Sequence, residues 1–151
     1  MSTIQVQEIL STLKKRREEN KLNYYQPYKF QKSFHQAGSE SNQRLLMAAN
    51  RVGKSYVGAM EMAAHLTGLY PKWWTGKKFD KPVKAWVCGA SNETTRDICQ
   101  KELFGQPDNP RDKGKGSIPK HLIGETTRKP GVPNAHSSVL VKHKTGGWSR
   151  V

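Results

Sequence analysis

The sequence predicts an α/β protein in which a parallel sheet is flanked by helices. Two short apolar runs, at 43–49 and 83–90, have the length of buried strands, and stretches with helical spacing follow them at 54–67 and 92–103. An alternating order of strands and helices favours a parallel sheet, because the crossover helices must pack on its faces. The 151 residues amount to about one domain.

The first segment of the chain predicts a helix over about 3–20. Ser2 followed by Gln5 resembles a capping box, and apolar residues then recur with helical spacing from Val6 to Leu13. The charged end of this stretch is typical of a solvated face. We therefore expect residues 1–24 to form an N-terminal helical segment in front of the main domain.

The next elements lead from an aromatic loop into the first strand and helix. The stretch NYYQPYKFQKSFHQAGSES at 23–41 predicts a loop and a short helix. Residues 43–49 are the expected first strand. The helix at 54–67 ends at Gly68, and Pro71 lies just beyond it, as is typical of a helix C-terminus.

The second half of the chain repeats this order. The run VKAWVCGA at 83–90 is the expected second strand, and Ser91 or Asn92 can cap the helix that follows. The region 104–135 is rich in Gly, Pro and charge, so we expect irregular chain there except around IPKHLI at 118–123. Residues 137–144 alternate enough to predict a third strand.

The composition favours an anionic partner in a reducing compartment. The chain carries 26 Lys and Arg against 12 Asp and Glu, a net charge of +14, and nucleic acid is the commonest partner of such a surface. Its two cysteines and five histidines show no disulfide or zinc spacing. No apolar run is long enough for a signal sequence or a membrane span. We therefore expect a cytoplasmic protein that contacts neither zinc nor membrane.

The chemistry of the sequence concentrates in 48-AANRVGKS-55, between the first strand and its helix. This stretch matches the phosphate-loop pattern G-x-x-x-x-G-K-[ST] except that Ala48 replaces the first Gly. In this pattern Gly53 lets the main chain approach the phosphates, Lys54 bridges the β- and γ-phosphates, and the Ser55 hydroxyl binds Mg²⁺. The loop therefore predicts ATP and Mg²⁺ as cofactors.

Two further side chains extend the predicted site. Arg51 lies within the loop and can neutralise charge on the γ-phosphate, in its own subunit or a neighbouring one; the alternative is that it faces solvent or pairs with an acidic side chain. Upstream, the amide of Gln31 suits the edge of adenine, with Tyr28 and Phe30 able to stack on the base. The alternative is a solvated glutamine on a short helix. The expected nucleotide-binding residues are Gln31, Ala49, Asn50, Arg51, Val52, Gly53, Lys54 and Ser55, with Lys54 and Arg51 also catalytic.

Together these stretches resemble the large terminase subunits of tailed bacteriophages. The resemblance rests on PYKFQKSFHQAG at 27–38, the loop at 48–55, the run from Val57 to Asp97, and 118–123. It implies a RecA-like P-loop NTPase core of the ASCE type that couples ATP hydrolysis to movement of double-stranded DNA into the procapsid, followed by an endonuclease domain. It also implies the small terminase subunit and the portal as partners, a homo-oligomeric ring, and the host cytoplasm as the place of action.

One departure from this family is the lack of an acidic strand. ATP hydrolysis in such enzymes needs a strand that ends in Asp and Glu, and no apolar run in the chain ends that way. We therefore expect residues 25–151 to be the N-terminal part of an ATPase domain that is incomplete at its C-terminal side. The remaining alternatives are another helicase-like translocase and a basic nucleic-acid-binding module without nucleotide chemistry.

Overall fold

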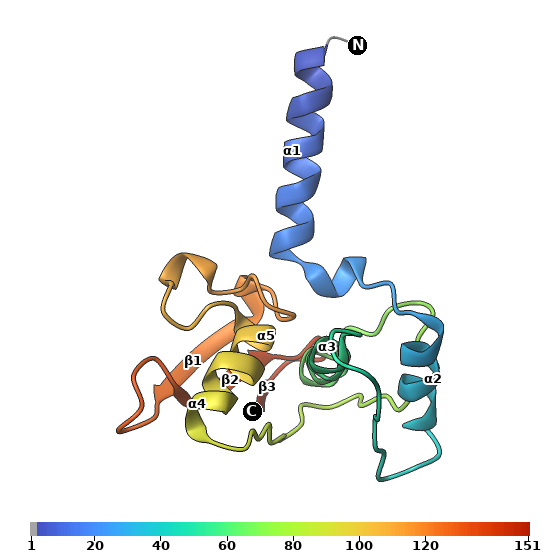
Figure 1. Ribbon diagram of the computed structural model, residues 1–151, viewed down its shortest axis with the longest axis vertical. Coiled ribbons are helices and arrows are strands. Elements are labelled where there is room, and N and C mark those ends of the chain that lie inside the picture. The colour runs from blue at the N-terminus through green and yellow to red at the C-terminus, as the bar shows by residue number, and fades with distance from the viewer. Residues whose placement is uncertain (1–2) are drawn as a thin grey trace.

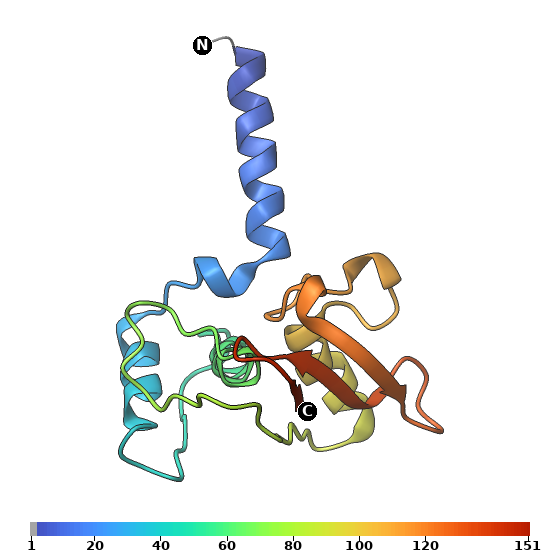
Figure 2. The ribbon, with the colours of Figure 1, turned by 180° about the vertical axis from the view of Figure 1, so that it is seen from behind.

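The computed structural model describes residues 3–151 of the chain. Helix α3 (Lys54–Thr67) runs through the centre, with α2 (Lys29–Ala37) on one side and the sheet and α5 (Lys101–Phe104) on the other (Figure 1). Helix α1 (Thr3–Glu19) projects away from this body, as the view from behind also shows (Figure 2). The remaining elements are η1 (Lys21–Tyr24), α4 (Asn92–Thr94), η2 (Thr95–Gln100), η3 (Pro110–Asp112), η4 (Lys120–Leu122), β1 (Ile123–Arg128), β2 (His136–Lys142) and β3 (Trp148–Arg150).

Helix α1 confirms the helix predicted over 3–20. The apolar stripe that predicts it is itself exposed: Ile9, Leu10 and Leu13 keep 50, 60 and 49% of their surface. The predicted capping box depends on Ser2, which lies outside the described residues. Nowhere in 3–151 does a helix combine the length and the apolar character that a membrane span requires.

Helix α3 supplies the middle of the apolar core. Its residues Val57, Met60 and Leu66 are completely buried, and the small side chains of Ala63 and Ala64 let other elements approach closely. Further core residues come from α5, from the segment before η4, from β2, and from η1 and two connecting segments: Leu103, Phe104, Ile118, Val139, Val141, Leu22, Tyr25 and Trp74. A helix that is buried along most of its length fixes the position of its own N-terminus, where the predicted phosphate loop ends.

The predicted end of this helix at Gly68 is confirmed. Gly68 has a φ of +71°, and its N–H donates to the carbonyl of Ala64. A side chain at this position would be strained by the backbone, and its Cβ would lie 2.4 Å from Nε2 of the buried His143. The position therefore requires glycine for two independent reasons.

The sheet is antiparallel, in the order β1, β2, β3. Strand β2 confirms the strand predicted over 137–144, and its buried Val139 and Val141 face the core. Strand β1 lies within the region where the sequence predicts irregular chain, so that prediction is wrong. The residues IGETTR show no alternating apolar face, and two register shifts interrupt their pairing with β2. Pattern reasoning therefore has no signal to detect there.

The two runs predicted as buried strands are extended but not paired as strands. Residues 43–49 form no strand, and 83–90 contribute one parallel bridge between Lys84 and Arg150. Leu45, Met47 and Trp86 are more than 80% exposed, so full burial of these runs is wrong for the described residues, but Val83, Ala85 and Val87 pack partly buried against the core. A strand needs a neighbour to accept and donate its backbone hydrogen bonds, and within 3–151 only β3 approaches these runs, at residues 83–85. The predicted parallel sheet stays a prediction.

The helix predicted over 92–103 is confirmed as one continuous helical stretch. It runs through α4, η2 and α5, and the six residues of η2 have π-helical bonding. Ser91 caps its start, since its side chain accepts a hydrogen bond from the Thr94 N–H. Leu103 and Phe104 at its end are buried against α3. This stretch covers the side of α3 opposite to α2.

A buried polar cluster joins α2, α3 and the chain just before the phosphate loop. Glu61 of α3 lies 2.8 Å from Nδ1 of His35 on α2, and Arg44 donates to both oxygens of the same carboxylate. The other ring nitrogen of His35 lies 3.0 Å from the Tyr25 hydroxyl. His65 lies one turn further along α3, 3.4 Å from Glu61. Glu61 and His35 are only 6 and 1% exposed, so the cluster is part of the core.

The electrostatics of this cluster keep Glu61 ionised. Burial alone would raise the pKa of its carboxyl, but the hydrogen bonds with His35, His65 and Arg44 and the charge of Arg44 outweigh that effect. The pKa of Glu61 therefore lies well below its ordinary value. The three partners offset the free energy that burial of the carboxylate costs. Removal of the carboxylate would leave the buried charge and hydrogen-bond donors of these partners without an acceptor.

Gly58 inside α3 and Gly68 at its C-cap allow a matched test of this packing. Gly58→Ala should stabilise the fold by about 0.5–1 kcal/mol, because Gly58 is an exposed interior helix position with nothing within 4 Å of an added Cβ. Gly68→Ala should destabilise it by about 1–3 kcal/mol through strain and the clash with His143. Chemical denaturation of both variants checks this, and equal effects in the same direction would contradict the helix end described here.

Removing the buried charge should destabilise the protein in a pH-dependent way. We expect Glu61→Gln to lower the free energy of unfolding by about 2–3 kcal/mol at pH 7, because Arg44 loses its counter-charge and His35 loses a charged hydrogen-bond partner. The pKa of Glu61 is lower in the folded than in the unfolded chain, so its contribution is complete above the ordinary value of 4.5 and is lost as the pH falls below it.

Denaturation curves of wild type and Glu61→Gln between pH 3 and 8 measure this dependence. The difference between the two proteins should be constant at neutral pH and shrink in acid. Glu40→Gln serves as control, because Glu40 is exposed and outside the cluster. A difference that stays constant down to pH 3 would argue against an ionised Glu61.

Candidate functional site

The predicted phosphate loop lies directly before the first turn of α3. Residues 48–53 connect the extended run at 43–47 to this helix, and Gly53 is its N-cap with a φ of +84°. Because α3 is anchored in the core, the loop is presented at the end of a rigid helix. Backbone N–H groups and the helix dipole at such an end attract anions.

The side chain of Lys54 folds back into the loop. Its ammonium donates to the carbonyl of Ala48 at 2.8 Å and to that of Ala49 at 2.6 Å. These solvent-exposed bonds join the start of the loop to its end and hold the ammonium against the loop. A phosphate group placed here would compete with two neutral carbonyls for the same ammonium, and an anionic acceptor forms the stronger bond.

Two residues of the loop, Arg51 and Gly53, have a positive φ. Arg51 has a φ of +65°, which is uncommon for a residue with a side chain, and it is exposed at the tip of the turn. Its guanidinium has no bonded partner among residues 3–151 and so remains available to an incoming group. Gly53 takes a positive φ without strain. Arg51 thus lies in the loop, and its side chain is exposed to solvent.

Ser55 is among the residues that line a cavity of about 340 Å³ between α3 and the run at 86–88. Met62, Trp86 and Leu103 make most of this cavity apolar, and Glu102 is its one acidic lining residue. Within residues 3–151, His, Cys, Asp and Glu nowhere gather in groups of three that could bind a metal ion.

Gln31 lies against the loop, as the prediction requires, but it is not solvated. Its side chain is only 2% exposed, and its Nε2 donates to the carbonyl of Val52 at 3.3 Å. Its Oε1 accepts from the N–H of Tyr28 at 3.0 Å. Tyr28 and Phe30 stack on each other beside it and are 70 and 41% exposed. The alternative of a solvated glutamine is thus wrong.

Sequence reasoning missed the residues that support the loop from behind. The histidines carry no motif, and Arg44 and Glu61 are 17 positions apart, so nothing in the sequence links them. Glu102, which shares a cavity with Ser55, comes from a helix predicted only for its packing. An arginine directly before an apolar run and a glutamate on the buried face of the next helix are the only signals that could have suggested this pair.

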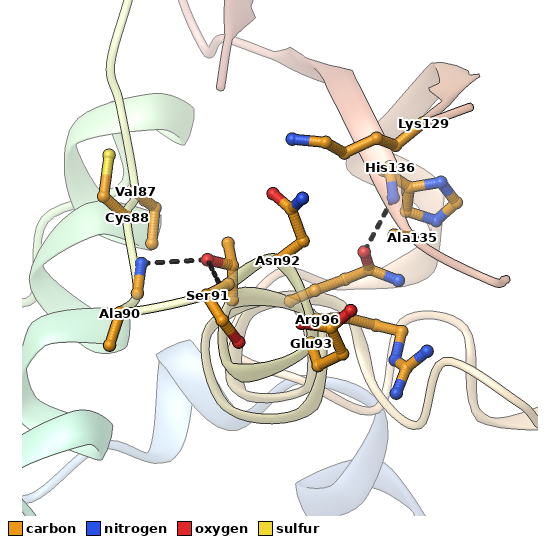
Figure 3. A pocket seen from close by; sticks show the side chains of 13 residues that line it. Val87, Cys88, Ala90, Ser91, Asn92, Glu93, Arg96, Lys129, Ala135 and His136 are labelled. Carbon is orange, nitrogen blue, oxygen red and sulfur yellow. Dashed lines mark hydrogen bonds between the residues drawn. The ribbon is translucent and has the colours of Figure 1, made fainter. Parts of the chain in front are cut away.

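A larger cavity, of about 540 Å³, lies away from the loop and contains none of the predicted site residues. It opens where the run at 87–91 enters α4, and Figure 3 shows Lys129 reaching across it towards Asn92. We place the candidate site at the loop in spite of the difference in size, because the loop gathers a glycine N-cap, a lysine and a hydroxyl at the end of a long helix.

Comparisons with known proteins agree with the resemblance seen in the sequence. The family described as "Terminase large subunit, T4likevirus-type, N-terminal" matches residues 45–150. The terminase large subunit of Salmonella phage P22 is 38% identical over 154 aligned positions, which cover 94% of this chain and 31% of that relative. No solved structure matches the chain. The chain therefore belongs to the large terminase subunits and corresponds to their N-terminal portion.

Proposed function

We propose that this chain binds ATP with Mg²⁺ as the nucleotide-binding part of a motor that packages double-stranded DNA into phage procapsids. The observation that carries the proposal is the position of the Lys54 ammonium, held inside a loop at the N-terminus of the buried helix α3. Family membership supports the packaging role. The chain spans only 31% of its P22 relative, so hydrolysis, translocation and DNA cleavage are proposed for the complete large subunit.

In this proposal the residues of the loop divide the work on the nucleotide. The N–H groups of residues 49–53 and the ammonium of Lys54 bind the phosphates, and the Ser55 hydroxyl orients the metal. Mg²⁺, when bound, neutralises phosphate charge. Arg51, exposed at the tip of the turn, adds a second cation either to the nucleotide of its own subunit or to that of a neighbour. Rigid attachment of the loop to α3 keeps these donors in place.

The exposed runs at 43–49 and 83–90 support the predicted RecA-like sheet. Leu45, Met47 and Trp86 present apolar side chains to solvent on extended backbone that has few hydrogen-bond partners. Such edges pair readily with further strands. We propose that strands of the complete subunit cover these two runs, and that one of them carries the acidic residues needed for hydrolysis.

The partners follow from charge and family. A net charge of +14 suits double-stranded DNA, whose phosphates release counterions when a basic surface neutralises them. We propose that the complete subunit acts in the host cell during virion assembly, as a homo-oligomeric ring together with the small terminase subunit and the portal of the procapsid.

Binding of an ATP analogue tests the nucleotide site. Titration calorimetry with Mg²⁺ should show binding to the wild type and a loss of about 100-fold or more in Lys54→Ala, since a charge-assisted bond to phosphate is removed. Lys15→Ala on α1 removes the same charge far from the loop and should bind like the wild type. Equal affinity of all three proteins would leave the basic nucleic-acid-binding module as the better account.

Salt dependence tests the proposed contact with DNA. The affinity for a short duplex should fall steeply as the salt concentration rises from 50 to 200 mM, because several phosphates are neutralised together. Lys54→Ala should bind the duplex as tightly as the wild type, since the loop lysine is reserved for nucleotide. Binding that does not change with salt would contradict a phosphate contact.

A further inference from the structure

We propose that Gln31 is a positioning residue that sets the shape of the phosphate loop, rather than a reader of the adenine base. The inference rests on the proposed nucleotide site, because it assigns a role within that site. In this role Gln31 contacts the main chain of the loop and does not contact the ligand.

The contacts of the Gln31 amide leave little of it for a base. Its oxygen accepts from the Tyr28 N–H, and its nitrogen donates to the carbonyl of Val52. The same nitrogen would lie 3.2 Å from a Cβ added to Gly53, so it is packed directly against the loop. Only 2% of the residue is exposed. One N–H and one oxygen lone pair of the amide remain unbonded, but a base edge would also need open surface, which the buried Gln31 lacks.

The helix that carries Gln31 is itself fixed to the core. His35, one turn later on α2, bonds to Glu61 of α3, and Arg44 donates to the carbonyl of Phe34 and to the same carboxylate. A movement of α2 relative to α3 would break this buried cluster. The contact between Gln31 and Val52 is thus made from a rigid support, and we define Gln31 with the Arg44, His35 and Glu61 cluster as the α2 brace.

Holding one carbonyl of the loop determines the direction of the next N–H group. The carbonyl of Val52 and the N–H of Gly53 belong to one planar trans peptide, so they point in opposite directions. When Gln31 binds the carbonyl on its side, the Gly53 N–H must face the other side of the loop. This N–H has no acceptor among the described residues. It is therefore available to an anion, which is the function that the loop pattern assigns to it.

Two substitutions of Gln31 separate positioning from base reading. Gln31→Ala removes the brace contact. Gln31→Glu keeps the size of the side chain and the acceptor for Tyr28, but sets a carboxylate oxygen against the Val52 carbonyl, which it repels. Gln36→Ala is the matched control, because Gln36 is an exposed glutamine on the same helix. Thermal unfolding of each variant shows whether it remains folded.

Binding of ATP, GTP and inorganic tripolyphosphate, each with Mg²⁺, is then measured by calorimetry. If Gln31 positions the loop, both substitutions weaken all three ligands by the same factor, about tenfold for one lost hydrogen bond and a misdirected N–H. If Gln31 reads the base, the loss is confined to ATP, and tripolyphosphate binds as it does to the wild type. That second result would overturn the inference while leaving the proposed nucleotide site intact.

Amide hydrogen exchange without any nucleotide provides an independent readout. Exchange of the Val57 N–H, which donates to the Gly53 carbonyl at the end of the loop, should be at least several-fold faster in Gln31→Ala than in the wild type and in Gln36→Ala, because the loop has lost its contact with α2. Unchanged exchange would contradict the brace. If the wild type binds none of the three phosphates, the proposed function fails, and the exchange measurement still decides whether Gln31 shapes the loop.

Discussion

The buried carboxylate of Glu61 is the interaction on which the rest of the site depends. Arg44 and His35 bond to it from two other segments, so that α2, α3 and the chain entering the phosphate loop meet at one charge. The geometry of the loop is therefore set from behind, by side chains that do not touch the proposed ligand. Because these contacts are buried and oppositely charged, they tolerate little change in position, which gives the loop a fixed frame.

The loop combines a fixed frame with a small number of adaptable groups. Gly53 and α3 provide rigid backbone, while the ammonium of Lys54 is bound to neutral carbonyls that an anion can replace. Arg51 remains outside the fold at the tip of the turn. In such an arrangement only the side chains need to reorganise when a ligand binds, since the backbone donors already point in the required direction. The missing first glycine of the pattern matters little in this account, because Ala48 contributes a carbonyl rather than an unusual backbone angle.

The sequence predicted the local features of this structure well and its long-range pairings poorly. The bounds of α3, its end at Gly68 and the position of the loop follow from helical spacing and glycine chemistry, which are local properties. The runs at 43–49 and 83–90 were expected to be buried, but strand burial depends on neighbours that spacing cannot reveal. The Glu61 cluster was missed for the same reason, since its members come from distant positions. Nucleotide binding by the loop residues stays a prediction.

The projection of α1 from the body affects how the stability of this chain should be measured. A 17-residue helix with an exposed apolar stripe has little tertiary support, and isolated helices of this length are marginal in water. Its helical signal will therefore fade gradually on heating, before the cooperative unfolding of the core. An unfolding enthalpy divided by the full chain length would understate the enthalpy per residue of the core, because about one residue in nine of the 151 belongs to a segment that does not melt with it.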